Sequence, residues 1–480
     1  MKITFTPDEK ELFALIANAS NNISTESFIV GGFIRDKLLS RPSKDIDITC
    51  IGDGISLAKE VKSLLKVKSE VNIFKNFGTA QIKTKGFEIE FVGARKESYN
   101  YNSRKPNIEP GSFMDDILRR DFTINTLSVS TKHIENGDII DNLGGVEDLK
   151  NQVLKTPLDP DITFSDDPLR MMRAIRFATQ LNFNIESNTF EAIKRNKERI
   201  AIVSIERITD ELQKIIASKK PSIGFKLLND CGLLKIIFPE FTDLQGIDII
   251  EGLAHKDNFY HTLQVLDNIS EKSDNIWLRW AAILHDIGKS KTKRFVENEG
   301  WTFHSHEIVG ANMVYKIFLR FKLPLDNKMK YVQNLVKLHL RPMALVDNNV
   351  TDSAVRRLLF DAGDDIDDLM VLAKSDITSK NQFKIDRFLE NYDKVIQKLA
   401  DIEEKDKLRN WQPPITGDEI MEVFSLKPSK EVGIIKTEIR EAILDGIIEN
   451  NKQEAWKYMI ETGIKMNLKV SDNLSKTYQQ

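Results

Sequence analysis

The spacing of apolar and polar residues predicts short strands and helices over residues 1–150. Residues 28–32 (FIVGG) are a short apolar run broken by glycines, and residues 45–52 (DIDITCIG) alternate as a half-buried strand does. Residues 79–94 contain two further alternating runs separated near Gly86, which predicts a hairpin. We therefore expect a small mixed sheet with helices in this part of the chain.

From about Pro168 onward the strand signal fades and apolar residues recur with helical spacing. The clearest helical runs are residues 168–181, 189–200, 204–217 and 277–289. Within the first part of the chain, residues 93–116 are polar, contain two prolines and show no periodicity, so we expect a long loop there. The predicted fold class is α+β, with an α/β front followed by all-α parts.

Composition places the chain among ordinary globular proteins. It has 480 residues, of which 41% are hydrophobic and 29% charged, enough for about three or four domains. No run approaches the roughly 18–20 apolar residues of a membrane-spanning helix, and acidic residues near the N-terminus argue against a signal peptide. Two cysteines, Cys50 and Cys231, make no disulfide framework, so we expect a cytoplasmic protein.

Two features near the start of the chain predict a site for a nucleotide and its metal ion. Gly31 and Gly32 lie between a strand and a helix, where backbone N–H groups can approach a phosphate, and Arg35 falls in the first helical turn. Asp45 and Asp47 are two residues apart on a strand, so both carboxylates point to one face and can hold Mg²⁺. An exposed edge strand gives the same Asp-x-Asp pattern, but the glycine turn upstream favours the metal site.

A third carboxylate and a polar cluster extend this predicted site. Glu90 shares a strand face with Glu88 and is our choice for the third acidic group, although an exposed sheet face alternates in the same way. In the segment LRRDFTINTLSV, Arg120 can clamp a triphosphate, and Asp121 and Asn125 can bond a ribose hydroxyl. A capping group on a surface helix would explain Asp121 alone but not the whole cluster.

Three arginines recur at every third position of a predicted helix: Arg170, Arg173 and Arg176. Asp167 lies three residues before Arg170, so the two side chains are neighbours that could pair with a base edge or with each other. Residues 170–220 contain eleven Lys/Arg and six Asp/Glu. Such a basic stretch can follow a phosphate backbone or can be a solvated helical face.

The order of these motifs resembles that of a known family. The motifs GGFIRD, KDIDIT, RRDFTINTL, DNLGGVEDL, DDPLRMMRAIRF and SIERITDEL follow one another as in the bacterial class II tRNA nucleotidyltransferases, the CCA-adding enzymes, and in the related poly(A) polymerases. The match covers roughly residues 24–220 and is highly specific. It implies template-independent, metal-dependent addition of CCA to tRNA 3′ ends from CTP and ATP.

The resemblance also implies residue roles. Asp45 and Asp47 are implied to bind Mg²⁺. The residues implied to contact the nucleotide are Gly32, Arg35 and Arg120. The residues implied to read the incoming base are Asp167 and Arg170, with Arg173 and Arg176 nearby. One departure is Asp166, where the family usually has Glu; its shorter side chain affects the geometry around the base-reading pair, not the pair itself.

Histidines in residues 255–376 carry a second resemblance. A His-Asp pair inside an apolar helix that ends at Gly288 is costly to bury unless it binds a ligand. The spacing is similar to that of the HD superfamily of metal-dependent phosphohydrolases, which implies a second divalent metal held by His261, His285, Asp286 and Asp376. The further ligands it suggests are His306 and His339, with Lys289 near the phosphate.

Two other functions stay open. A poly(A) polymerase has similar motifs and would extend RNA 3′ ends with ATP alone. An HD phosphohydrolase could use the front domain only to bind RNA. Family members that add only CC are expected to lack part of the segment between the second and third motifs, whereas here Arg95, Glu97 and Tyr99 lie in a segment of full length.

We expect four parts in the chain. They are a nucleotidyltransferase head (1–150), an all-α neck with base recognition and RNA binding (151–240), an HD-type helical domain (241–400) and a helical tRNA-binding tail (401–480). The expected partners are tRNA, CTP and ATP, with no membrane and no DNA. The oligomeric state is left open.

Overall fold

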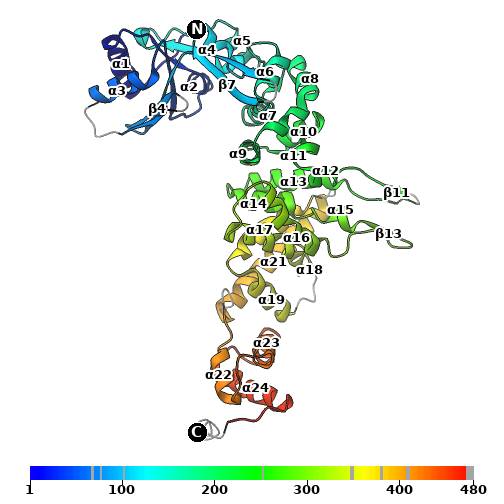
Figure 1. The fold of residues 1–480 in the computed structure, drawn as a ribbon. Helices are drawn as coiled ribbons and strands as arrows, with labels where there is room; N and C mark the ends of the chain where they lie inside the picture. Colours follow the sequence, from blue (N-terminus) through cyan, green and yellow to red (C-terminus); the bar gives the residue numbers. More distant parts are fainter. Residues whose placement is uncertain are drawn as a thin grey trace. The chain divides into compact units, whose positions relative to one another are not determined.

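A computed structural model describes residues 1–65, 70–75, 78–100, 103–250, 253–345, 351–378, 382–406 and 411–471. Its contacts divide the chain into two compact units, Met1–Thr242 and Asp243–Gln480. The predicted α+β class is confirmed, since a mixed sheet precedes helical parts (Figure 1). The finer division into four parts remains a prediction. In the described part of the chain, no helix is long and apolar enough to cross a membrane.

A six-stranded sheet forms the front of the first unit, in the order β3-β4-β5-β2-β1-β8. Its strands are β1 (Ser27–Val30), β2 (Asp45–Cys50), β3 (Val71–Phe74), β4 (Thr79–Thr84), β5 (Phe87–Gly93) and β8 (Ser128–Ser130). The pairing of β2 with β5 is parallel and the other pairings are antiparallel. The strands predicted at residues 28–32 and 45–52 and the hairpin near Gly86 are confirmed.

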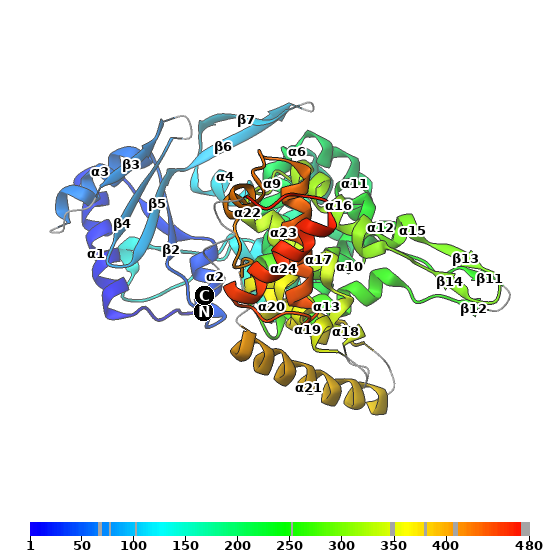
Figure 2. The same cartoon turned by 90° about the horizontal axis from the view of Figure 1, so that it is seen from below.

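One face of this sheet is the apolar core of the head. Ile46 and Ile48 of β2 lie beside Ile89 and Phe91 of β5, and all four side chains are buried. Helices α1 (Pro7–Asn22) and α3 (Gly54–Leu64) lie on the same side of the sheet (Figures 1 and 2). The alternation of the strands therefore places the intervening carboxylates on the opposite face.

The expected loop over residues 93–116 was wrong for most of its length. Strands β6 (Arg95–Asn100) and β7 (Ser103–Pro110) pair as an antiparallel hairpin, and α4 (Phe113–Leu118) follows. Pro106 within β7, Pro110 at its end and the polar side chains hid this hairpin, because a two-stranded ribbon outside the main sheet needs no apolar face. The backbone of Tyr99 is part of β6, but its side chain lies outside the described residues.

Helices complete the first unit. The remaining elements are α2 (Gly32–Leu38), η2 (Thr123–Asn125), η3 (Thr131–His133), α5 (Gly145–Lys150), β9 (Val153–Leu154), α6 (Pro160–Asp166), α7 (Leu169–Leu181), β10 (Asn184–Ile185), α8 (Ser187–Asn196), η4 (Lys197–Ile202), α9 (Ile205–Ile216), α10 (Ser222–Asp230), α11 (Leu233–Ile237) and α12 (Pro239–Thr242). Helix α7 carries the predicted arginine series and packs against α9.

The second unit is mainly helical, with two small hairpins that the sequence reading missed. Its elements are β11 (Ile249–Ile250), β12 (Leu253–Ala254), α13 (Asn258–Ser270), α14 (Ile276–Leu284), α15 (Lys289–Thr292), β13 (Arg294–Val296), β14 (Gly300–Thr302), α16 (His306–Arg320), α17 (Asn327–Leu338), α18 (Arg341–Ala344), α19 (Asp352–Ala362), η5 (Gly363–Asp365), α20 (Ile366–Asp376), α21 (Gln382–Asp406), α22 (Gly417–Phe424), α23 (Lys430–Leu444) and α24 (Lys452–Lys465). Strands of two or three residues are too short to show a sequence period.

The helix expected to end at Gly288 ends earlier. Helix α14 stops at Leu284, and His285 is its C-terminal cap. The backbone therefore turns at the His285-Asp286 pair, and α15 starts only at Lys289. This turn lets the two adjacent side chains reach the same point, which consecutive residues within a helix cannot do.

The turn before α5 is organised by one carboxylate. Asp141 Oδ1 accepts from the backbone N–H of Gly145 at 2.8 Å, and Oδ2 accepts from that of Val146 at 2.9 Å. A Cβ at Gly145 would lie 2.3 Å from the carbonyl oxygen of Thr123, so only glycine allows this approach. The turn formed by Asp141 and Gly145 thus packs α5 against η2, and η2 carries part of the predicted nucleotide site.

We predict that Asp141→Ala lowers the free energy of unfolding of the first unit by about 1–3 kcal/mol, because several backbone N–H groups lose their acceptor. Urea unfolding followed by far-UV circular dichroism measures this. All five tryptophans lie between residues 277 and 456, so their fluorescence reports the second unit and should not change. Asp138→Ala is the matched control, since its ion pair with Lys2 is long and exposed. Equal stability of the two variants would contradict the prediction.

Candidate active sites

Three predicted carboxylates come together on the open face of the sheet. In the parallel pairing of β2 and β5, Asp47 lies opposite Glu90 and Asp45 lies opposite Glu88. Burial raises the pKa of Asp47 despite the opposing charge of Arg120, and Asp45 adds to the rise. Burial and the charge of Asp47 also raise the pKa of Glu90. Carboxylates that repel one another in this way form an oxygen-rich site for a hard divalent cation.

The predicted glycine turn lies directly beside these carboxylates. Gly31 has a φ of +76° and precedes helix α2 (Gly32–Leu38). A Cβ on Gly31 would lie 2.9 Å from Arg120 Nη1 and 3.6 Å from Asp47 Oδ2. Both the left-handed backbone and the narrow space therefore require glycine here. The turn, the arginine and the carboxylate line one pocket.

A buried chain of polar side chains forms one wall of this pocket. Arg35 Nη1 donates to Asn125 Oδ1 at 2.7 Å, and Asn125 Nδ2 donates to Asp121 Oδ1 at 2.8 Å. Arg173 Nε donates to Asp121 Oδ2 at 2.8 Å. Burial alone would raise the pKa of Asp121, but Arg173 and Asn125 outweigh it and lower the pKa to about 2. The predicted cluster is thus one hydrogen-bonded network around an ionised Asp121. Asp121 and Asn125 are bonded to each other in it, rather than pointing free toward a ribose.

The sequence reading missed Asp116, which anchors the arginine pair. Asp116 is fully buried, and its carboxylate accepts from Arg120 Nη2 at 2.9 Å and from Arg119 Nε at 2.9 Å. Thr49 Oγ1 of β2 donates to the same carboxylate at 3.2 Å. The spacing of Asp116 three and four residues before two arginines was the available signal, since such residues are neighbours on a helix.

Three arginines surround the ring of Phe177. The guanidinium carbons of Arg35, Arg173 and Arg176 lie 4.8, 5.4 and 4.2 Å from its centroid. Arg176 is buried and pairs with Glu211 of α9 at 3.1 Å, and burial lowers its pKa to about 10. Glu211 was also missed, although it lies in the quoted SIERITDEL motif. The aromatic face lets like charges approach one another at lower cost.

These groups line a pocket of about 440 Å³. Its lining residues are Gly31, Gly32, Phe33, Arg35, Asp36, Ser43, Asp45, Asp47, Arg120, Asp121, Asn125, Arg173, Arg176, Phe177 and Gln180. The lining contains both carboxylates and guanidinium groups, a combination suited to a polyphosphate and its counter-ion.

The predicted base-reading residues lie beside this pocket and are not among its lining residues. Asp167 follows α6, and its Oδ1 accepts from the backbone N–H of Leu169 at 3.3 Å. Arg170 Nη2 donates to the carbonyl oxygen of Arg119 at 2.6 Å. Both side chains can reach a base only if they turn away from these backbone partners.

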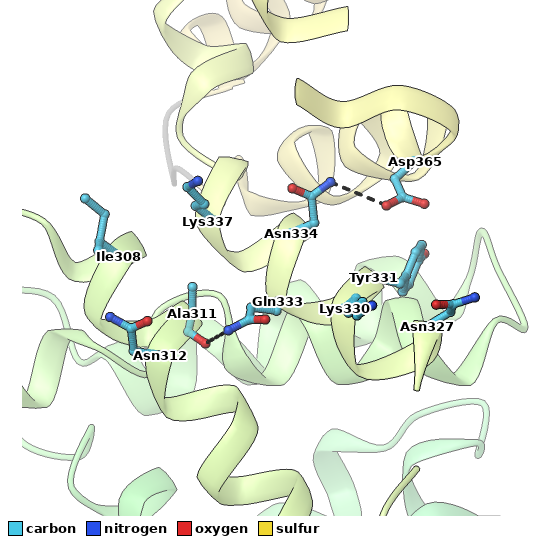
Figure 3. A pocket seen from close by; sticks show the side chains of 10 residues that line it. All are labelled: Ile308, Ala311, Asn312, Asn327, Lys330, Tyr331, Gln333, Asn334, Lys337 and Asp365. Atoms are coloured by element: carbon cyan, nitrogen blue, oxygen red, sulfur yellow. Dashed lines mark hydrogen bonds between the residues drawn. The ribbon is translucent and has the colours of Figure 1, made fainter. Parts of the chain in front are cut away.

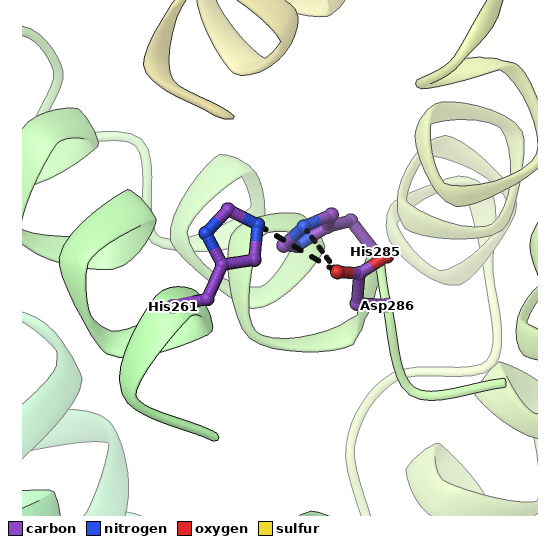
Figure 4. Close-up of side chains that lie close together, drawn as sticks. All are labelled: His261, His285 and Asp286. Atoms are coloured by element: carbon purple, nitrogen blue, oxygen red, sulfur yellow. Dashed lines mark ion pairs between the residues drawn. The ribbon is translucent and has the colours of Figure 1, made fainter. Parts of the chain in front are cut away.

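The histidine cluster of the second unit is assembled around Asp286. Its Oδ2 lies 3.6 Å from His261 Nε2 and 3.3 Å from His285 Nε2 (Figure 4). On the other side, its Oδ1 lies 3.3 Å from His306 Nε2 and 3.8 Å from His339 Nε2. The predicted ligands are thus brought together, including the two suggested as additional. They form two groups of possible metal ligands that share Asp286.

Asp376 and two lysines complete the surroundings of this cluster. Asp376 Oδ1 lies 2.7 Å from His261 Nε2 and 3.6 Å from His285 Nε2. Lys289 Nζ lies 2.7 Å from Asp286 Oδ2, as predicted for a cation near this site. Lys256 Nζ, which the sequence did not single out, lies 2.8 Å from His261 Nδ1.

Burial and neighbouring charges shift the pKa values of the histidines in this cluster. Burial lowers the pKa of His285, but Asp286 and Asp376 outweigh it and raise that pKa to about 10. Burial lowers the pKa of His339 to about 4, and the charge of His285 acts in the same direction. His285 Nε2 is buried without a hydrogen-bond partner. Imidazole and carboxylate groups around such an atom fit a divalent metal ion, which would displace the proton of His285 on binding.

A larger pocket of about 710 Å³ lies elsewhere in the second unit, between α16, α17 and η5 (Figure 3). Two of its amides are already engaged, since Gln333 donates to the carbonyl oxygen of Ala311 and Asn334 to Asp365. Apart from Ile308 and Ala311, its remaining lining side chains are polar, and none of the lining residues belongs to the histidine cluster. Size alone therefore does not locate the chemistry in this unit.

Three known family models match parts of this chain. The poly A polymerase head domain matches residues 27–155, the probable RNA and SrmB-binding site of polymerase A matches residues 182–244, and the HD domain matches residues 258–376. The first match contains the carboxylates and the glycine turn. The third contains every member of the histidine cluster except Lys256.

Individual relatives agree with these matches. The A-adding tRNA nucleotidyltransferase of Deinococcus radiodurans is 31% identical over 363 residues, which span 73% of this chain and 79% of that protein. The CCA-adding enzyme of Ligilactobacillus salivarius is 35% identical over 239 residues, 49% of this chain and 56% of that protein. The Bacillus stearothermophilus CCA-adding enzyme in complex with CTP has the same fold, with a TM-score of 0.68, 21% identity and coverage of 96% and 99%.

We predict that Asp121→Asn lowers the stability of the first unit at neutral pH by about 2 kcal/mol, the free energy that corresponds to its lowered pKa. Because the folded-state pKa lies below the ordinary value, this contribution is present above about pH 4 and is lost as the pH falls toward 2. Urea unfolding by circular dichroism at pH 7, 4 and 3 should therefore show the gap between parent and variant narrowing. Asp210→Asn, at an exposed position of α9, is the control. A gap independent of pH would refute the assignment.

Proposed function

This chain belongs to the tRNA nucleotidyltransferase and poly(A) polymerase family, and we propose that it adds CCA to tRNA 3′ ends from CTP and ATP without a nucleic-acid template. The observation that carries the proposal is the pocket in which Asp45 and Asp47 face Arg35, Arg120 and Arg173. Acidic ligands for a metal ion and cationic groups for a triphosphate meet there. We place this reaction in the cytoplasm.

Asp45 and Asp47 would hold Mg²⁺, with Glu90 as the third acidic group. A Mg²⁺ ion supplies charge neutralisation and favours the ionised form of the attacking 3′-hydroxyl. The donor set fits this ion, because it consists of carboxylate oxygens and the repulsion within it needs a cation. The register of β2 and β5 keeps the three carboxylates in place.

The basic side of the pocket would bind the triphosphate. The turn at Gly31 and Gly32 offers backbone N–H groups at the start of α2, and Arg35 and Arg120 offer guanidinium donors. When the 3′-hydroxyl attacks the α-phosphate, negative charge moves onto the departing pyrophosphate, and these fixed cations stabilise it. Asp116 holds Arg120 in position for this role.

The ribose and the base would meet the wall formed by η2 and α7. Asp121 and Asn125 carry acceptors near the ribose position, and Arg173 and Arg176 line the same side. We assign base selection to Asp167 and Arg170, in agreement with their place at the start of α7. For this, Arg170 exchanges its bond to the Arg119 carbonyl for a bond to the base.

A narrower activity has support of its own. The Deinococcus radiodurans relative, matched over 363 residues, is named an A-adding tRNA nucleotidyltransferase. The complete hairpin β6–β7 between the second and third motifs favours addition of all three nucleotides instead. The two activities differ in the tRNA end that they accept, so one assay separates them.

We predict that the purified chain, given tRNA that lacks CCA together with CTP and ATP, adds three nucleotides and stops. Single-nucleotide gels with labelled CTP or ATP measure this. Incorporation only into tRNA ending in CC would support A addition, and long A tails would support poly(A) polymerase. No incorporation on any substrate would leave the HD phosphohydrolase with an RNA-binding front domain.

Two variants of neighbouring glutamates on β5 test the metal site. We predict that Glu90→Gln lowers kcat by about 10²–10³-fold, and that the control Glu88→Gln keeps kcat unchanged.

We predict that Arg170→Ala weakens discrimination between nucleotides. Loss of a paired base contact costs about 1–3 kcal/mol, so kcat/KM for CTP and ATP should fall about 10- to 100-fold, while the small value for UTP changes little. Arg195→Ala removes a half-exposed arginine of α8 that pairs with Asp161 and serves as control. An equal loss for all three nucleotides would mean that Arg170 binds phosphate or supports the fold rather than reading the base.

A further inference from the structure

The last three helices form a module with a hydrophobic core of its own. Ile420 and Phe424 of α22, Ile439 of α23 and Met459 of α24 are buried members of one apolar cluster. A Cβ on Gly463 of α24 would lie 2.1 Å from the ring of Phe424, so only glycine lets these two helices approach so closely. Helices α22–α24 are therefore held together by their own apolar contacts.

Polar side chains join this module to α19. Arg357 Nη2 lies 2.9 Å from Asp445 Oδ1, and Arg357 also pairs with Glu441, where both acids belong to the end of α23. Ser353 Oγ donates to Asp445 Oδ1 at 2.7 Å. Burial raises the pKa of Glu441, but Arg440 and Arg357 outweigh it and lower that pKa. Ser353 and Arg357 lower the pKa of Asp445. We call these bonds the α19–α23 contact.

The α19–α23 contact is open to competition from other anions. The side chains of Arg357, Glu441 and Asp445 are 34%, 31% and 40% exposed. Water and dissolved ions screen charges at such positions, so ion pairs there contribute little stability. An anion that matches the guanidinium group of Arg357 can therefore replace the two carboxylates at small cost.

Arg357 also lines a pocket of about 360 Å³. Arg341 and Thr351 supply further polar groups, and the rest of the lining is apolar: Ala344, Leu345, Ala354 and Leu358. Guanidinium groups bind a phosphate through paired hydrogen bonds, whereas apolar side chains accommodate the flat face of a nucleobase. The volume lies in the range of small-molecule sites. The lining therefore fits a nucleoside phosphate.

We propose that this pocket binds a nucleoside phosphate, and that the bound ligand releases the α19–α23 contact by drawing Arg357 away from Glu441 and Asp445. Carboxylate and phosphate oxygens accept from the same N–H groups of a guanidinium, so Arg357 cannot serve both fully. Ligand binding and the contact therefore oppose each other, and the ligand loosens the module of residues 411–471 from α19. This site is separate from the pocket of the first unit.

Tryptophan fluorescence reports this site separately from the first unit, whose sequence contains no tryptophan. Trp411 belongs to the module, and its ring centroid lies 5.9 Å from that of Phe360 on α19. AMP is titrated into the full chain, and Trp411→Phe identifies the part of the signal that comes from Trp411. We expect a saturable change in that emission, with AMP binding at least about 10-fold more tightly than inorganic phosphate or adenosine.

Variants test the competition for Arg357. Arg357→Gln should weaken AMP binding about 10-fold or more, because a charge-assisted contact is lost. Arg294→Gln, at an exposed arginine of β13, is the matched control and should leave AMP binding unchanged. Glu441→Gln combined with Asp445→Asn should tighten AMP binding instead, since the competing acceptors no longer carry charge. A purely structural role of these acids would not tighten it.

Hydrogen exchange measures the release of the module. Saturating AMP should speed amide exchange at both sides of the α19–α23 contact in the parent chain, but not in Arg357→Gln. Circular dichroism confirms that each variant is folded. An emission of Trp411 that does not respond to AMP, equal binding of phosphate and AMP, or unchanged affinity in Arg357→Gln would overturn the proposed site. Weaker AMP binding in the variant without the two acids would overturn the competition.

Discussion

The parallel pairing of β2 with β5 is the constraint on which the site of the first unit depends. Side chains alternate along a strand, so a shift of one residue in this register would turn Asp47 or Glu90 into the core and bring Ile48 or Ile89 to the open face. The buried apolar side chains on the opposite face prevent such a shift. The hydrophobic core under the sheet therefore holds the carboxylates together against their own repulsion.

Charge compensation on the open face follows from that constraint. Gathered acidic groups need cations, and the arginines that supply part of the balance are themselves held by buried acids. Asp116 holds the arginine pair at the end of α4, Asp121 holds Arg173, and Glu211 holds Arg176. A buried ion pair contributes little net stability, because removing its charges from water is costly. We therefore interpret these pairs as holding the arginine side chains in place at the pocket.

The second unit solves a related problem through the backbone. There, carbonyl oxygens of preceding turns orient three imidazole rings around one carboxylate, and no arginine is needed. The early end of α14 matters here, because it lets His285 and Asp286 reach the same point from consecutive positions. The two units thus use different donors: carboxylate oxygens on a sheet in one, and imidazole nitrogens between helices in the other.

The sequence by itself determined the fold class, the main strands and helices, and many of the side chains that the structure brings together in the pocket of the first unit and in the histidine cluster. These follow from local periodicity and from motifs whose spacing survives in the structure, as for Asp45, Asp47 and the arginine series of α7. The tertiary structure alone decided the hairpin at 95–110, the anchoring roles of Asp116 and Glu211, and the division of the histidines into two groups around Asp286. It also placed Asp167 and Arg170 on backbone partners rather than in the pocket. Such features depend on contacts between residues distant in the chain and on which ring nitrogen meets a carbonyl, and no local pattern records them.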